Sequence, residues 1–571
     1  MQKILKKIVD NKYSVLCLLF IILSGLILRL IGINKPEGLW CDELYSYYTS
    51  LSLQDIGVLG LLKQTAIPLY YLSFYFWIDW CGNQDIILRL FSVLFGILTI
   101  PVIFLAGKEL LNKKIGLIAA GLVAVNSFAI YYSQEVRYYS FLMFLASVFL
   151  LFLIKIFNNP TRFNYICLIL AAIGIALSFP IGFLYVFIQL FVVGIYFKLK
   201  DKNKFNKFVK YNLILLGFLS PYLIALAYNI FFLQGQVDVI PVFFSFVNII
   251  VLAQNWFSPE ITGLVNVNPL YYQEIFKNTA RLGHYIVFLI IPVALSLFAL
   301  FKAAFKEKIN MLLFISAFLF LGVEIIATML GKFVLLSKYT IIFLPIVILL
   351  AAYGLASLKN KFVSYFLVFI LIGINVFYIF SSPFSAPKKQ RVEALKSVAY
   401  ILENYDLSSE DLVFMPYGGA LIDKYFDKSP VMEFQFSETF AIKNKKGRHS
   451  FEKLFKSEEK ITGDKIYDRL KYFINNNKHI DYFEDYFLAE GINKLKKDGY
   501  FVIVSSKNIA VYGNKITKID SVIDKILKKQ PVFFLYCSKI TQDAIELSSS
   551  NLKLIKKEER GVWEVYIFKK S

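Results

Sequence analysis

Residues 13–45 decide the fold of this chain, because a long apolar stretch there leads directly into a short acidic one. Residues 13–33 read YSVLCLLFIILSGLILRLIGI, and residues 37–45 read EGLWCDELY. A bilayer core of ~30 Å is spanned by about 20 mostly apolar helical residues. The first stretch is therefore predicted to cross a membrane, and the adjacent carboxylates Asp42 and Glu43 then lie at the membrane surface just beyond it.

The composition is that of a chain that crosses the membrane many times. Hydrophobic residues make up 57% of the 571 positions and include 57 Phe and 36 Tyr, whereas an average soluble domain is closer to half apolar. The net charge of +21 does not indicate nucleic-acid binding, because the Lys and Arg residues form no motif of a nucleic-acid fold. Attraction to anionic lipid head groups is the better interpretation.

Eleven segments are long and apolar enough to be predicted as membrane-spanning helices. A helix is the expected spanning form, because it pairs all of its backbone polar groups within one segment. They are residues 13–33, 88–107, 115–133, 139–157, 163–179, 180–197, 211–232, 284–301, 310–330, 338–357 and 362–381. The Lys and Arg residues of the connections fall mostly on one side, which the positive-inside rule assigns to the cytoplasm. The chain is thus predicted to be a multi-pass protein of the plasma membrane, with a cytoplasmic N-terminus.

The outer loops are predicted to contain helices that lie in the head-group zone. Residues 44–62 and 66–80 are rich in Leu, Tyr and Trp with interspersed polar groups, and residues 241–256 are similar. Aromatic side chains favour this zone of the bilayer. Interfacial helices are therefore expected in the first outer loop.

The sequence changes in character after Pro383, where apolar strands begin to alternate with helical patterns. Strands are predicted at 411–415, 500–505, 532–537, 552–558 and 562–568, and helices at 390–404, 418–426, 487–497 and 519–528. This alternation is typical of an α/β domain. We predict a transmembrane domain at 1–383 and an extracytoplasmic α/β domain at 384–571.

The first candidate site is the Asp42-Glu43 pair. Acids are favoured in the first turn of a helix, so a purely structural role in starting the next helix is one interpretation. A carboxylate beside an apolar wall can also have its proton affinity tuned, and it can then act as a general base.

Three further clusters carry polar groups at the predicted outer ends of spans. Residues 131–139 read YYSQEVRYY and contain Glu135 and Arg137, which could also form a structural ion pair. Residues 66–71 read AIPLYY and contain Tyr70, and the Pro could simply start an interfacial helix. Lys338 and Tyr339 lead into a late span, where the Lys side chain could instead snorkel to the surface.

The predicted topology places the charged members of these clusters on one side of the membrane and at similar depth. We expect one outward-facing cavity to be lined by Asp42, Glu43, Glu135, Arg137, Lys332 and Lys338. Cations in such a cavity suit a lipid phosphate, and a carboxylate there can accept a proton.

The order of the motifs resembles glycosyltransferase family 39. That group contains the dolichyl-phosphate-mannose protein mannosyltransferases and the aminoarabinose transferases of lipid A. The resemblance rests on WCDE at 40–43, PLYY at 68–71, LRLFS at 88–92, YSQEVRYY at 132–139, and Lys338-Tyr339 followed by Pro345. It implies a GT-C type membrane fold. It also implies inverting transfer of a sugar from a polyprenyl-phosphate carrier to an extracytoplasmic protein, lipid or cell-envelope glycan.

The same resemblance implies roles for individual residues. Asp42 corresponds to the catalytic base, with Glu43 as its neighbour, and Glu135 and Arg137 correspond to the second acidic and basic positions. The substrate and its phosphate are expected to be bound by Arg137 together with Glu135, Lys338, Tyr339, Lys332, Arg281 and Tyr70.

The chain departs from the family pattern at two places. Ala66-Ile67 stands before Pro68 where many members have His or Lys and a second Pro, and Ser178-Phe179-Pro180 stands where relatives often have Thr-His-Tyr. The acceptor and part of the donor contacts are therefore left open.

Two other functions compete with transfer. A transporter or flippase of lipid-linked sugars would be expected to show internal repeats, broken helices or buried charges in its spans, and the sequence is interpreted as showing neither repeats nor such charges. A non-catalytic membrane scaffold remains the third interpretation. The adjacent carboxylates could hold a divalent ion, but no accompanying ligand set is recognisable, so no metal and no cofactor are predicted.

Overall fold

The structure is a computed structural model. It describes residues 2–34, 38–39, 41–64, 67–231, 291–329, 337–380, 400, 402–405, 412–415, 431–433, 500–506, 552–560 and 563–570. The chain divides into two compact units. One consists of residues 1–35 and 45–390, and the other of residues 36–44 and 391–571.

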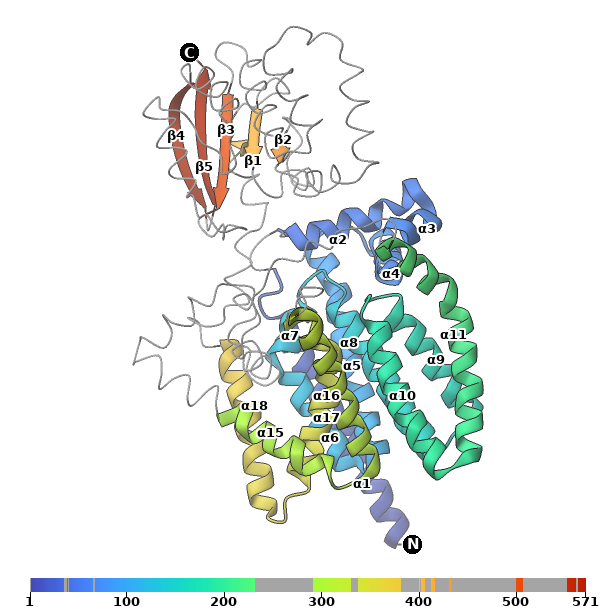
Figure 1. Ribbon diagram of the computed structural model, residues 1–571. Helices are drawn as coiled ribbons and strands as arrows, with labels where there is room; N and C mark the ends of the chain where they lie inside the picture. The colour runs from blue at the N-terminus through green and yellow to red at the C-terminus, as the bar shows by residue number, and fades with distance from the viewer. Residues whose placement is uncertain are drawn as a thin grey trace. The chain divides into compact units, whose positions relative to one another are not determined.

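The first unit is a bundle of long helices with shorter helices at one end (Figure 1). Its first half contains α1 (Gln2–Leu30), α2 (Cys41–Leu51, of which Tyr45–Leu51 belong to this unit), α3 (Leu53–Gln64), α4 (Pro68–Cys81), α5 (Asp85–Leu110), α6 (Lys113–Val125), α7 (Ser127–Ser133) and α8 (Tyr139–Asn158). Its second half contains α9 (Arg162–Ala176), α10 (Gly182–Lys200), α11 (Lys202–Phe231), α15 (Ile291–Ala304), α16 (Lys308–Met329), the 3₁₀ helix η2 (Ser337–Phe343), α17 (Leu344–Ala356) and α18 (Lys361–Phe380).

Within the described residues, six helices are long and apolar enough to cross a membrane, and a bent pair makes a seventh candidate. Each of the eleven predicted segments is helical over most of the part that the structure describes. Several of these helices are short, such as α9 and the described part of α18, so the number of eleven spans stays a prediction.

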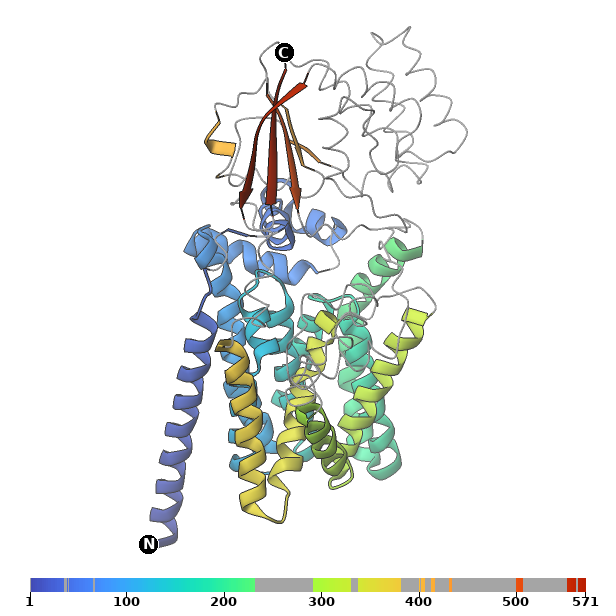
Figure 2. The same ribbon diagram turned by 90° about the vertical axis from the view of Figure 1, so that its left-hand side faces the viewer.

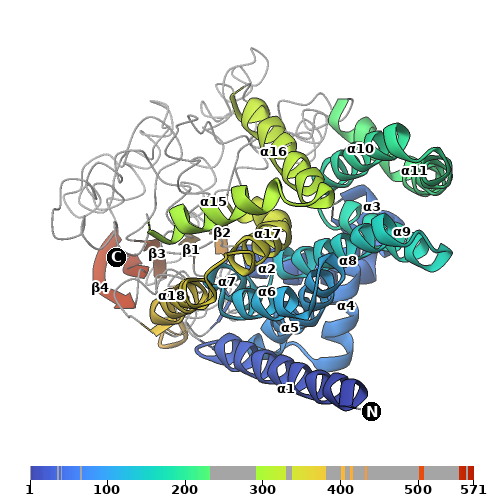
Figure 3. The same cartoon turned by 90° about the horizontal axis from the view of Figure 1, so that it is seen from below.

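The bundle has an exposed edge and a buried centre. Only 17% of the apolar stretch of α1 is buried, whereas 89% of the stretch Lys338–Ala356 is. Figure 2 shows α1 along one side of the bundle, and Figure 3, which shows the bundle from below, places α17 beside α6, α15 and α18. An exposed apolar surface on α1 is expected where a helix faces lipid.

Glycines allow the central helices to pack closely. A Cβ atom on Gly116 of α6 would lie 2.5 Å from the Phe104 carbonyl oxygen of α5, and one on Gly354 of α17 would lie 1.9 Å from the Ala299 carbonyl oxygen of α15. Small residues at helix contacts are the usual means of close packing in membranes, where the hydrophobic effect does not drive helices together.

The helices predicted between the first two spans are present. Pro68 begins α4 at a position where its missing N–H is not needed, as the sequence indicated. The polypeptide turns within α3 at Gly57, whose φ of +64° is readily adopted only by glycine. The head-group location of α2, α3 and α4 stays a prediction, and the similar segment 241–256 lies outside the described residues.

One predicted span differs from expectation. Residues 115–133 read as one apolar segment, but the helix breaks at Asn126 into α6 and α7, which are bent by 58° to one another. The Asn126 side chain accepts a hydrogen bond from the Ala129 backbone N–H at 2.9 Å, which starts a new helix within the apolar run.

The second unit contains a five-stranded mixed sheet. Its strands are β1 (Leu412–Met415), β2 (Val431–Glu433), β3 (Tyr500–Ser506), β4 (Leu552–Arg560) and β5 (Trp563–Lys570), in the order β2-β1-β3-β5-β4. β1 is parallel to β2 and β3, whereas β5 is antiparallel to β3 and β4. The four predicted strands that correspond to β1, β3, β4 and β5 are thus confirmed, whereas β2 was not predicted. The predicted strand 532–537 and the predicted helices after residue 405 lie outside the described residues.

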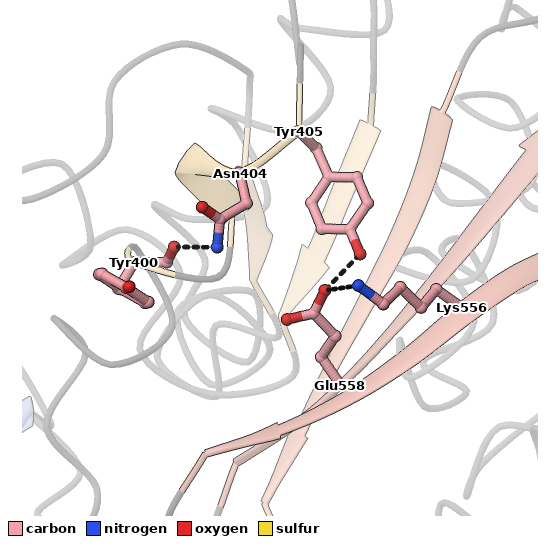
Figure 4. Close-up of polar contacts among 5 residues, drawn as sticks. All are labelled: Tyr400, Asn404, Tyr405, Lys556 and Glu558. Atoms are coloured by element: carbon pink, nitrogen blue, oxygen red, sulfur yellow. Dashed lines mark hydrogen bonds and ion pairs between the residues drawn. The ribbon is translucent and has the colours of Figure 1, made fainter.

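A polar cluster ties the end of a short helical segment to this sheet (Figure 4). The Tyr405 hydroxyl donates to Glu558 Oε1 at 2.6 Å, and Lys556 Nζ lies 2.8 Å from the same oxygen. Lys556 and Glu558 stand two residues apart on β4 and therefore share a face of the sheet.

Candidate functional site

A row of four aromatic rings from four separate segments forms the centre of the candidate site. The rings belong to Tyr70 of α4, Tyr138 before α8, Phe179 between α9 and α10, and Tyr339 of η2. The centroids are 6.2 Å apart for Tyr70 and Tyr138, 5.8 Å for Tyr138 and Phe179, and 5.7 Å for Phe179 and Tyr339. We call these four residues the aromatic row. The row therefore connects Tyr70 with Tyr339, which is 269 residues further along the sequence.

Two cations lie beside rings of the aromatic row. The Arg137 guanidinium carbon lies 5.7 Å from the Tyr138 ring centroid, and Lys338 Nζ lies 5.7 Å from the Tyr339 ring centroid. Both cations are partly exposed, whereas Tyr70 and Tyr138 are buried. The structure thus brings together Arg137, Lys338, Tyr339 and Tyr70, four of the residues predicted from the sequence. Arg137, Lys338 and the aromatic row are together called the cationic cluster.

The electrostatics of Tyr138 show how the cluster is connected. Burial raises the pKa of the Tyr138 phenol well above its usual value, and the neighbouring Tyr139 and Tyr339 raise it further. Arg137 and Lys338 both act in the opposite direction, so each cation lies within electrostatic range of this one hydroxyl. At neutral pH Tyr138 is therefore a neutral phenol, which can donate a hydrogen bond but cannot serve as a base.

The loop that carries Arg137 is fixed at several points. Ser92 Oγ of α5 donates to the Glu135 carbonyl oxygen at 2.6 Å, and the Arg137 backbone N–H donates to the same carbonyl at 2.8 Å. The guanidinium itself donates to Ser46 Oγ of α2 at 3.2 Å. Glu135, only 2% exposed, stands at the buried side of this loop. Arg137 thus stands on a loop that is held at several points, and the residue as a whole is partly exposed.

The acidic pair lies at the start of α2. Asp42 and Glu43 are both in the first turn of that helix; Glu43 is fully buried and Asp42 is partly exposed. Ser46, which binds Arg137, follows Asp42 by one helical turn and is on the same face of α2. Residues 36–44 belong to the second compact unit, so the convergence of Asp42 and Glu43 with the cationic cluster stays a prediction.

Two predicted cations, Arg281 and Lys332, lie outside the described residues. In the described part of the chain, no group of three or more His, Cys, Asp or Glu side chains is arranged to hold a metal ion. That the protein requires no metal therefore stays a prediction from the sequence.

One departure from the family pattern falls at the middle of the site. Phe179 stands in the aromatic row between Tyr138 and Tyr339, where relatives often have a polar ring. The turn that carries it is held to the start of α4, because the Leu69 backbone N–H donates to the Leu177 carbonyl at 3.1 Å. Ile67 and residues 178–180, where this chain differs from relatives, thus lie within three residues of one hydrogen bond, whereas Ala66 lies outside the described residues.

Sequence reasoning missed three buried charged residues. Arg29 of α1 and Arg89 of α5 are completely buried, and Glu324 of α16 is 2% exposed. Arg89 donates to the Ile33 carbonyl at 3.0 Å, at the end of the first span. The expectation that the spans contain no buried charges is therefore wrong. Arg29 stands within the quoted stretch 13–33, and its charge in an apolar run is the signal that could have identified it.

Comparison with known families agrees with the motifs. Residues 65–224 match the family described as dolichyl-phosphate-mannose-protein mannosyltransferase, which confirms the resemblance drawn from the sequence. No curated protein matches the chain by sequence.

Solved structures with a similar architecture include ArnT from Cupriavidus metallidurans in the apo state. It is 10% identical with a TM-score of 0.55, and the alignment covers 98% of this chain and 98% of that chain. ArnT bound to undecaprenyl phosphate has 11% identity, a TM-score of 0.49, and coverage of 96% and 97%.

A more remote match is the Archaeoglobus fulgidus oligosaccharyltransferase complex with Zn and sulfate, with 14% identity and a TM-score of 0.43. This chain is covered over 72% of its length and spans 62% of that one. The match to apo ArnT shows the fold, which is of the predicted GT-C type. With the apolar helices, this identifies a multi-pass membrane protein.

Proposed function

We propose that this chain, which matches the dolichyl-phosphate-mannose-protein mannosyltransferase family over residues 65–224, transfers a sugar from a polyprenyl-phosphate carrier to an extracytoplasmic acceptor. The acceptor class is a protein, a lipid or a cell-envelope glycan. The family description supports a lipid-phosphate donor, and the ArnT-like fold supports a membrane-embedded enzyme.

The observation that carries the proposal is the cationic cluster. Arg137 and Lys338 are partly exposed and stand beside the same row of rings. The carrier phosphate gains negative charge as its bond to the sugar breaks. Cations that are already in place stabilise this developing charge without reorganisation, which lowers the barrier. Arg137 can bind phosphate through two parallel N–H groups, whereas Lys338 acts as a point charge.

Asp42 is the proposed base. Its carboxylate accepts the proton of the acceptor hydroxyl as the oxygen attacks the anomeric carbon. The bond from that carbon to the phosphate oxygen breaks in the same step, and the electron pair leaves with the polyprenyl phosphate. The carbon is attacked opposite the leaving group, so its configuration inverts. Tyr138 cannot replace Asp42 in this role, because its raised pKa keeps the phenol protonated.

The remaining assignments belong to the same proposal. Glu43 supports Asp42, Glu135 and Tyr339 line the substrate site with Tyr70, and Lys332 and Arg281 supply further positive charge. Residues 1–383 form the transferase domain and residues 384–571 an extracytoplasmic α/β domain. The N-terminus is cytoplasmic, and no cofactor or metal is required.

The base is tested by replacing Asp42→Asn in the full chain. Glycolipids and glycoproteins are analysed by mass spectrometry from cells that lack the protein or carry either form. Asp55→Asn is the matched control, because Asp55 is also a first-turn acid, on the neighbouring helix α3, and is exposed. We expect one glycoform to require the protein, to be lost with Asp42→Asn by about 100-fold or more, and to be retained with Asp55→Asn.

If the glycoform persists with Asp42→Asn at near-normal amounts, Asp42 is not the base. If cells with and without the protein have the same glycoforms, transfer itself is the wrong function.

The phosphate-binding role is tested separately with Arg137→Met and Lys338→Met. The donor KM is expected to rise about tenfold for each lost charge-assisted contact, with protein yield unchanged. Lys361→Met is the control, since this exposed residue begins α18 and touches neither the row nor Arg137 among the described contacts. If the donor KM is the same in all three variants, the cationic cluster does not bind the donor phosphate.

A further inference from the structure

The break between α6 and α7 leaves backbone groups that a continuous helix would pair with one another. In an unbroken helix, the Ser127 N–H would donate to the Val123 carbonyl four residues earlier. Here the Ser127 N–H donates instead to Asn375 Oδ1 of α18 at 3.2 Å. Unpaired backbone groups are costly inside a membrane, so the break requires partners from other helices.

Arg29 supplies the missing donors. Its Nη2 donates to the Val123 carbonyl at 3.3 Å, and its Nη1 donates to the Ala124 carbonyl at 2.9 Å. These are the carbonyls at the open end of α6, where the helix dipole also favours a positive charge. The freed acceptor and the freed donor of one broken hydrogen bond are thus satisfied by residues of two other helices.

The same side chain also holds the far side of the break. Arg29 Nε donates to Ser133 Oγ, the last residue of α7, at 3.2 Å. Directly afterwards, Gln134 Nε2 donates to the Arg29 carbonyl at 2.7 Å and to the Ile31 carbonyl at 3.0 Å. One residue of α1 therefore contacts the end of α6, the end of α7 and the first residue of the next loop.

That loop, residues 134–138, is the one that carries Glu135 and Arg137. The direction in which it leaves α7 depends on the angle of the break. A planar guanidinium with several donors at fixed angles can set such an angle, which a single flexible ammonium cannot do.

We propose that Arg29 is a positioning residue, which together with Ser133 and Asn375 holds the bend between α6 and α7 and so places the Arg137 loop to receive a phosphate. Arg29, Ser133 and Asn375 are together called the clamp. The second half of this inference rests on the proposed function. The first half, the control of the bend, does not.

The test removes the partners of Arg29 and keeps Arg29 itself, so that the stability cost of removing a completely buried charge does not obscure the result. Ser133→Ala removes the oxygen that accepts from Arg29, and Asn375→Ala removes the acceptor of Ser127. Ser147→Ala is the control for the first, because Ser147 is buried on α8 and its hydroxyl donates only to the Met143 carbonyl four residues earlier. Asn212→Ala is the control for the second, because the Asn212 amide donates to Phe208 in the way that Asn375 donates to Leu371.

Two measurements are made on the full chain in lipid nanodiscs. Hydrogen exchange of the amides at 126–139 reports the bend without any requirement for activity. Binding of undecaprenyl phosphate reports the loop. We expect about tenfold faster exchange in both test variants, and undecaprenyl phosphate affinity lower by about three- to tenfold, with both controls unchanged.

The two measurements test control of the bend and placement of the Arg137 loop separately. Unchanged exchange in Ser133→Ala and Asn375→Ala would overturn the clamp. Faster exchange with unchanged affinity would overturn its connection to the phosphate loop. If the unmodified chain does not bind undecaprenyl phosphate, the proposed function loses its donor, while the exchange result still decides whether the clamp exists.

Discussion

Charged groups are held in two contrasting ways in this protein. Arg29 in the helical unit is completely buried and donates hydrogen bonds to three backbone carbonyls and one hydroxyl. Glu558 in the sheet unit accepts hydrogen bonds from Lys556 and Tyr405 (Figure 4). This ion pair lies at the surface, where the Glu558 side chain is 23% exposed and the Lys556 side chain 59% exposed.

Burial decides how much each of these charged groups contributes to the stability of the fold. A surface ion pair exchanges its contacts with water at little net gain, and its median contribution is about 0–1 kcal/mol. A buried cation that satisfies otherwise unpaired carbonyls has no water to replace it, so its loss is much more costly. Arg29 is thus expected to matter for both stability and geometry, and Glu558 mainly for local order.

The largest effect is expected from Arg29→Met. The substitution keeps an unbranched apolar side chain but leaves the Val123 and Ala124 carbonyls without their donors. The free energy of unfolding should fall by about 3 kcal/mol, measured by unfolding of the purified protein in micelles. Arg162→Met is the control, because Arg162 is an exposed arginine at the start of α9, and its substitution should change stability by less than about 0.5 kcal/mol. If both substitutions lower the free energy of unfolding by the same small amount, the buried arginine contributes no more to stability than the exposed one.

The packing around Arg29 gives a second, intermediate effect. A Cβ atom on Gly96 of α5 would lie 2.2 Å from Ser133 Oγ and 2.9 Å from Arg29 Nε. Gly96→Ala should therefore push α5 away from the clamp and lower stability by about 1–3 kcal/mol in the same unfolding assay.

Gly121→Ala on α6 is its matched control, since the nearest atom to a new Cβ there is 3.9 Å away. That variant should be unchanged, or more stable by up to about 1 kcal/mol because alanine favours a helix. Comparable losses at Gly96 and Gly121 would show that the close approach at Gly96 is unimportant.

The smallest effect is expected from Glu558→Gln. The hydrogen bonds from Lys556 and Tyr405 lower the pKa of the Glu558 carboxyl. Because the folded-state pKa is lowered, the stabilisation is fully present above the ordinary Glu pKa of about 4.3 and is lost as pH falls through the lowered folded-state value.

At neutral pH the substitution should cost less than about 1 kcal/mol, and it should abolish the acid-dependent part of the protection of β4. Both the stability cost at neutral pH and the acid-dependent protection are measured by amide hydrogen exchange at residues 552–560. The exchange rates are compared at each pH with those of an unfolded peptide of the same sequence. A loss as large as that of Arg29→Met would show that the surface ion pair contributes as much to stability as the buried arginine.

Much of the architecture could be read from local patterns. Apolar runs of span length identified the helices, Pro68 marked the start of α4, and alternating segments located β1, β3, β4 and β5. These features depend on properties of neighbouring residues, which is why a single sequence is sufficient for them. The three-residue strand β2 is too short for any such pattern.

The candidate site could be predicted only in part. Tyr70, Arg137, Lys338 and Tyr339 were selected from motifs, and the structure places them together. The role of Phe179 as the ring between Tyr138 and Tyr339 could not be read from its neighbours, because its contacts come from Tyr138, which precedes α8, and from Tyr339 of η2.

Local sequence patterns were sufficient to predict a membrane chain with many apolar helices, a following domain rich in strands, and charged residues at the helix ends. Tertiary structure alone decided that residues 115–133 bend at Asn126 and that Arg29 is buried against the break. The reason is physical. Helix formation is encoded by local spacing, whereas a break in a membrane helix is stable only when donors and acceptors from distant segments, here Arg29 and Asn375, satisfy the groups that it frees.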